Sequence, residues 1–291
     1  MDYLTITRRP DLRAPIAVVA FAGWNDAASA ATNAARFVVR RLGARKFATI
    51  DPETFYAFSE SRPIVRVDLR GTRHIDWPAN DFYYARNPGG AHDVIVSIGV
   101  EPNLRWRTFA ALHENLFNEL GVTMAVSLGA LMADVPHTLP VRVTGTAADP
   151  EVAERLNLTT SRYEGPTGIV GVLHDQLRRS TVPAASLWAN VPHYLTASQN
   201  PPATFALLHR LQGMLGLEFD FSELIAAGER FVGEVDAAVA ANPEISAHVR
   251  RLEEAAAAPD RPPPAGPSSL PAGRDIVLDV EEFLRGQRDD S

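Results

Sequence analysis

Residues that could bind a ligand follow the apolar runs of this chain, at the points where the runs end. The runs and the residues that follow them are 16–21 with Asn25 and Asp26, 93–99 with Glu101, 122–128 with Gly129, and 184–189 with His193. A carboxamide, two carboxylates and an imidazole could together hold a polar small molecule or contact a partner. Each also has a structural interpretation: Asn25 and Asp26 can cap a helix, and Glu101 can pair with Arg105 or Arg107.

A glycine-rich turn, residues 165–168 (GPTG), opens a predicted helix that continues to residue 180. The free N–H groups and dipole of a helix start can hold an anion, so Tyr163, Gly165 and Thr167 are candidate binding residues. Alternatively, Gly168 and Gly171 only let the helix lie close to the sheet.

No complete catalytic motif occurs. Ser97 and Ser127 lack the upstream glycine of a Gly-x-Ser-x-Gly elbow, and we interpret both as ordinary strand serines. The chain also lacks a His-Glu-x-x-His metal motif, a Walker loop, a Gly-x-Gly-x-x-Gly fingerprint and the kinase motifs. We therefore predict no catalytic residues, no metal and no cofactor.

Two Val-Pro-His tripeptides, ending at His137 and His193, each follow a predicted strand. Proline would rigidify the turn and direct the ring outward, which suits either binding or a structural hydrogen bond. We favour the structural interpretation.

Composition excludes several classes of protein. The formal net charge of −7 argues against nucleic acid as a partner, and the absence of cysteine excludes disulfides and thiolate chemistry. Lys46 is the only lysine, which excludes sites that hold phosphates with several lysines, as in ATP-grasp enzymes. No apolar run is long enough for a membrane helix, and we expect a cytoplasmic protein without membrane contacts.

Strands alternating with helices predict an α/β fold. We expect a three-layer αβα sandwich with a mainly parallel mixed sheet, plus C-terminal helices. Residues 64–86 alternate apolar and polar side chains and predict antiparallel strands or a hairpin at a sheet edge. In such a fold the candidate residues lie at the edge formed by the carboxyl ends of the strands.

The chain divides by composition into four parts. We predict an α/β core (1–200), a helical extension packed on it (201–258), a Pro-rich linker (259–274) and an amphipathic helix with a tail (275–291). Ile276, Val280, Phe283 and Leu284 share one face of this last helix, and so short a helix needs a surface to dock on.

Four motifs in this order resemble the proteasome assembly chaperone 2 family in its bacterial branch. They are 20–26 (AFAGWND), 127–137 (SLGALMADVPH), 163–171 (YEGPTGIVG) and 186–194 (SLWANVPHY). The resemblance implies a fold similar to the purine nucleoside phosphorylase and hydrolase group without that group's active site. Eukaryotic relatives help assemble the proteasome α-ring as oligomers. Some relatives dock by a C-terminal hydrophobic-Tyr-X tail, from which the last five residues here (QRDDS) depart.

These observations lead to one main interpretation and two alternatives. We expect a non-enzymatic, chaperone-like protein that forms a homo-oligomer and binds protein partners, with proteasome subunits among the candidates. The first alternative is a binding protein or enzyme for a nucleoside or phosphorylated metabolite at the strand edge. The second is a terminal helix that covers a binding site on the core.

Overall fold

The computed structural model describes residues 3–161, 163–180, 182–195 and 199–257. The predicted linker (259–274) and terminal helix (275–291) lie outside this described part. None of the described helices has the length and hydropathy needed to cross a membrane.

A nine-stranded mixed sheet forms the centre of the molecule, in the order β1-β3-β6-β7-β2-β8-β11-β9-β10. Its strands are β1 (Leu4–Ile6), β2 (Ile16–Ala22), β3 (Arg45–Ile50), β6 (Asn80–Ala85), β7 (Val94–Val100), β8 (Met124–Ala133), β9 (Val143–Ala147), β10 (Thr159–Thr160) and β11 (Ala184–Pro192). The four central strands, β7, β2, β8 and β11, run parallel, and antiparallel pairings flank them on both sides. The predicted α/β class with a mainly parallel mixed sheet is confirmed.

Continuous apolar runs form the central strands because both faces of the sheet are covered. In β2, Ala17, Val19 and Phe21 enter one hydrophobic core, whereas Val18 and Ala20 enter the core on the opposite face. This two-sided burial distinguishes β2 from a strand with one face in water.

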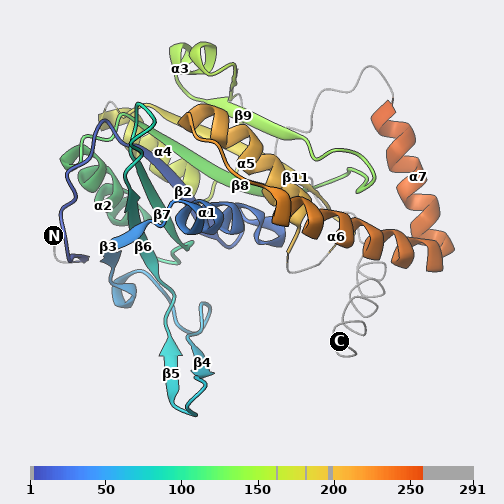
Figure 1. Cartoon of the computed structure of the whole chain (residues 1–291), viewed down its shortest axis with the longest axis horizontal. Coiled ribbons are helices and arrows are strands. Elements are labelled where there is room, and N and C mark those ends of the chain that lie inside the picture. The colour runs from blue at the N-terminus through green and yellow to red at the C-terminus, as the bar shows by residue number, and fades with distance from the viewer. Residues whose placement is uncertain (1–2, 162, 181, 196–198, 258–291) are drawn as a thin grey trace.

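Helices form the two outer layers of the sandwich (Figure 1). The helices are α1 (Ala30–Arg41), α2 (Trp106–Glu119), α3 (Pro150–Arg155), α4 (Ile169–Ser180), α5 (Pro201–Leu215), α6 (Ser222–Ala241) and α7 (Pro243–Ala257). Buried side chains of α1 and α5 share one core, and those of α2 and α4 share the core on the opposite face. The three layers agree with the predicted sandwich.

The last two helices, α6 and α7, extend beyond the sandwich (Figure 1). Their apolar side chains, including Val235 and Val249, form a separate small core with Tyr194 and Leu195 from the end of β11. The division of the chain at residue 200 stays a prediction.

A two-stranded hairpin, β4 (Ile64–Val67) and β5 (Arg73–Asp76), projects from the body of the molecule (Figure 1). Its strands pair only with each other among the described strands. The predicted hairpin is confirmed, but the predicted edge position is wrong for the following strand, because β6 lies between β3 and β7 inside the main sheet.

Candidate functional site

Glu101 joins two loops at the carboxyl edge of the parallel strands. Its Oε1 atom accepts hydrogen bonds from Asn25 Nδ2 at 3.2 Å and from the backbone N–H of Ile169 at 2.8 Å. The local ion pair with Arg105 or Arg107, which the sequence permits, is absent, because the described salt bridges include none with Glu101. The chain's own carboxylate therefore occupies the start of α4, where the sequence suggests an anion site.

Glycine permits this close contact. A β-carbon on Gly168 would overlap the side-chain amide of Asn25 and lie 2.7 Å from Glu101 Oε1. Asn25 is itself buried. The alternative interpretation, in which Gly168 lets the helix approach the sheet, agrees with this geometry.

Asp26 caps α1. Its carboxylate accepts from the backbone N–H of Ala31 at 2.7 Å and from the Thr32 hydroxyl at 2.5 Å. Burial raises the pKa of Asp26 above its ordinary value, while the Thr32 and Ala31 hydrogen bonds oppose that rise. The predicted capping role is confirmed for Asp26 and is wrong for Asn25, whose side chain donates to Glu101 instead.

Gly129 faces an aromatic ring. It lies opposite Trp188 in the parallel pair of β8 and β11, and a β-carbon on Gly129 would overlap the indole. The indole thus occupies the space beside Gly129 in which a ligand would have to bind.

The turn before α4 is exposed. Tyr163 donates a hydrogen bond from its hydroxyl to the carbonyl of Pro166 at 2.9 Å, above Gly165, which has a φ of +156°. Thr167 is exposed as well. Tyr163 thus lies over Gly165, whereas Thr167 lies beside Gly171. A role in binding stays a prediction for Tyr163, Gly165 and Thr167.

Both Val-Pro-His histidines contact the helices that extend beyond the sandwich. His137 lies between the Tyr194 hydroxyl, 2.6 Å from Nδ1, and the Asp236 carboxylate of α6, 3.0 Å from Nε2. His193 contacts Asp134, and its ring centroid lies 5.3 Å from that of His248 in α7. Folding thus places the two tripeptides where α6 and α7 meet the strand ends.

Two Ser–His pairs, one buried and one partly buried, were not expected. Ser97 Oγ lies 3.1 Å from His113 Nε2, and Ser127 Oγ lies 2.7 Å from His174 Nε2. Burial lowers the pKa of each histidine to about 4. Both serines are buried, so neither can attack a substrate from solvent. The burial of His113 could have been predicted from the sequence, because His113 lies four residues after Phe109 and four before Phe117, on the apolar face of α2.

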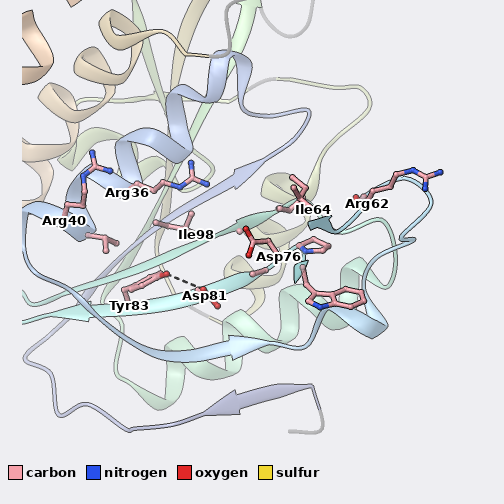
Figure 2. A pocket seen from close by; sticks show the side chains of 15 residues that line it. Arg36, Arg40, Arg62, Ile64, Asp76, Asp81, Tyr83 and Ile98 are labelled. Carbon is pink, nitrogen blue, oxygen red and sulfur yellow. Dashed lines mark hydrogen bonds between the residues drawn. The ribbon is translucent and has the colours of Figure 1, made fainter. Parts of the chain in front are cut away.

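A cavity lies between α1 and the base of the hairpin (Figure 2). It has a volume of about 610 Å³, and Arg36, Arg40, Tyr83 and Trp77 are among its lining residues. The eight predicted site residues are not among those that line it. Across the described residues, no group of three His, Cys, Asp or Glu side chains is placed to hold a metal ion.

One prediction concerns Glu101. We expect Glu101→Ala to lower the free energy of unfolding by about 2 kcal/mol, because it removes the acceptor at the start of α4 and that of the buried Asn25. Urea denaturation measures this change. Glu164→Ala, at an exposed glutamate in the nearby turn, is the control and should change stability by less than about 0.5 kcal/mol. Equal effects of the two substitutions would show that Glu101 does not hold the edge together.

The fold and the edge together define a class of protein: a three-layer α/β sandwich whose strand-edge loops bind one another, with a separate hairpin extending into solvent. Comparison with known proteins identifies the family. The model of the PAC2 family matches residues 20–239, and the chain belongs to this family.

Solved structures agree with this assignment. A PAC2 family protein from Streptomyces avermitilis is 40% identical, with a TM-score of 0.75 over 81% of this chain and 99% of its own. A proteasome-assembly chaperone homologue from Mycobacterium tuberculosis is also 40% identical, with a TM-score of 0.73 over 80% of this chain and 99% of its own. An archaeal proteasome activator from Pyrococcus furiosus, 19% identical, shares the fold with a TM-score of 0.66 over 81% of this chain and 99% of its own. A search of curated proteins finds no match.

Proposed function

We propose that this protein is a non-enzymatic, chaperone-like member of the PAC2 family that forms a homo-oligomer and binds other proteins. Family membership supports the chaperone-like role, since a 40% identical relative is described as a proteasome-assembly chaperone homologue. Proteasome subunits are accordingly the first candidates among other proteins. The observation that carries the proposal is the β4–β5 hairpin, whose apolar side chains contact water.

The hairpin exposes six large apolar side chains, of which Val65, Val67 and Ile75 share one face. They are Ile64, Val65, Val67, Leu69, Ile75 and Trp77. An isolated two-stranded hairpin is only marginally stable in water, and its outer edges offer unpaired backbone groups to another chain. Exposed apolar patches of this kind mark surfaces that bind proteins. We infer that a protein surface covers the hairpin in the assembled state.

The charge of the hairpin indicates an acidic partner. Residues 62–76 contain four arginines against two aspartates, whereas the whole chain has a net charge of −7. A second copy of the chain is therefore electrostatically suited to receive the hairpin. Two hairpins pairing with each other would instead bring like charges together.

The experiment compares Val67→Ser/Leu69→Ser with wild type by light scattering after size exclusion, native mass spectrometry and capture from the source cell. We expect wild type to be oligomeric and the variant to assemble or bind at least tenfold more weakly. Leu139→Ser, which removes another exposed leucine, is the control and should behave as wild type.

Two results would contradict the proposal. One is a wild-type protein that is monomeric and captures no other protein. The other is a hairpin variant that assembles and binds as wild type does. A rise in melting temperature with a nucleoside or phosphate would instead favour the small-molecule alternative, because ligands stabilise the state that they bind.

A further inference from the structure

The cavity at the base of the hairpin has an apolar floor and an arginine rim; we call it the arginine groove. Val39 and Ile98 are among its apolar lining residues, and Ile64 and Trp77 belong to the hairpin side. Figure 2 shows Arg36 and Arg40 on α1 at one side of the groove and Arg62 near the hairpin. A groove of this composition suits a segment with apolar and acidic side chains.

The charges of the groove are unbalanced. None of its three arginines, Arg36, Arg40 and Arg62, forms a salt bridge with any residue in the described part of the chain. Its two carboxylates do have cationic partners: Asp81 binds Lys46 at 2.7 Å, and Asp76 binds Arg66. The groove therefore carries positive charge that the described residues leave unneutralised.

We propose that the arginine groove docks the acidic amphipathic segment 275–291 of the same chain. The segment contains six acidic residues and two arginines. In a helix, its apolar positions Ile276, Val280, Phe283 and Leu284 form one stripe, with acidic positions on both sides of it. The stripe matches the apolar floor of the groove, and the flanking carboxylates match its arginines.

The chain that joins this segment to the core has an extended length comparable with the width of a globular protein of this size. Residues 258–274 number 17, and a Pro-rich linker extends by about 3 Å per residue, or roughly 50 Å in all. A globular unit of this size has a radius of gyration of about 18 Å, so the linker can cross most of its surface. Tethering also gives the segment an effective concentration on the order of millimolar, which favours docking on its own chain over docking on a second copy.

The functional consequence of this docking rests on the proposed function, in which the hairpin binds another protein. A docked segment would cover the base of the hairpin and compete with the acidic surface of a partner. Removal of the segment should then strengthen partner binding. The docking itself is measured as a crosslink within one chain, which needs no partner. A failure of the docking proposal can therefore be distinguished from a failure of the proposed function.

The absence of cysteine makes a direct test possible in the full-length chain. Cysteines are introduced as Ile64→Cys in the groove and Leu284→Cys in the segment and are joined with a short bis-maleimide. We expect an intramolecular crosslink at least ten times as abundant as that between Leu139→Cys and Leu284→Cys. The control is strict, because Leu139 follows Thr138, which hydrogen-bonds to Glu253 in α7, near the start of the linker.

Charge reversal tests the electrostatic match. Arg36→Glu/Arg40→Glu should reduce the groove crosslink at least tenfold, and adding Asp279→Arg/Glu282→Arg should restore it. Both arginines are exposed on α1, and equal melting temperatures would show that the fold is retained. Equal crosslinking at residues 64 and 139, or no effect of charge reversal, would overturn the proposal. Crosslinks between ¹⁵N-labelled and unlabelled chains would also overturn it, since they would place the segment on a second copy.

Discussion

Replacing Gly129 with alanine is expected to lower the free energy of unfolding by about 3 kcal/mol, because the new β-carbon would overlap the indole of Trp188. Trp188 packs against the core that α2 and α4 share, so moving its ring would leave a void there. For a protein of this size the melting temperature should fall by roughly 6–12 °C. Urea denaturation and thermal melting measure the two quantities.

Two further variants test this explanation. Gly233→Ala, at an exposed helix position with nothing near the new β-carbon, should instead stabilise the protein by about 0.5–1 kcal/mol. Trp188→Leu should also lower the free energy of unfolding. Because the two residues are in contact, this loss should be smaller by at least about 1 kcal/mol in the Gly129→Ala variant than in the wild-type protein. If Gly129→Ala were as harmless as Gly233→Ala, Gly129 would be free to contact a ligand.

Lowering the pH from 7 to 5 is expected to remove about 2 kcal/mol of unfolding free energy through His113 alone. Burial lowers the pKa of His113 to about 4 in the folded protein, whereas an exposed histidine has an ordinary value of 6.5. Between these values the unfolded chain binds a proton and the folded chain does not, so stability falls as the pH falls. His174 acts in the same direction for the same reason. Asp26 has the opposite effect on stability. Because its pKa is raised in the folded protein, the folded state binds a proton at a higher pH than the unfolded chain does.

The measurement is urea denaturation at half-unit steps of pH. His113→Gln, which keeps a polar group beside Ser97, should reduce the slope near pH 5.5 by roughly 1.4 kcal/mol per pH unit, the value for one proton. Asn115→Gln, at an exposed position on α2 without a titrating side chain, is the control and should leave the slope unchanged. An unchanged slope in His113→Gln would mean that the buried ring already binds a proton in the folded state.

Much of the fold could be predicted from local sequence. The central strands are continuous apolar runs, and β2 was placed within one residue of its observed end at Ala22. Asp26 could be assigned as a cap because its hydrogen bonds reach only five and six residues along the chain. The hairpin could be predicted from its alternating pattern, but its separation from the main sheet could not. That separation arises because β3 and β6 pair within the main sheet, whereas β4 and β5 pair with each other.

The candidate site was predicted at the correct edge with incorrect contacts. The sequence permitted Glu101 to pair with nearby arginines, yet its partners are Asn25 and the start of α4, 76 and 68 residues away. Gly129 was treated as a possible ligand contact, yet Trp188 lies beside it. Ser97 and Ser127 were treated as ordinary strand residues, because nothing in their local sequence indicates a histidine on a distant helix.

By itself the sequence determined the elements, the class of fold and the resemblance to a family, since apolar periodicity, helix caps and short motifs act over a few residues. Only the tertiary structure decided that the edge residues bind one another, that the two Val-Pro-His turns contact α6 and α7, and that an arginine groove opens beside an exposed hairpin. The physical reason is that strand order and register bring distant residues together. Local sequence specifies neither, so a site assembled from four strand ends takes its contacts from the fold.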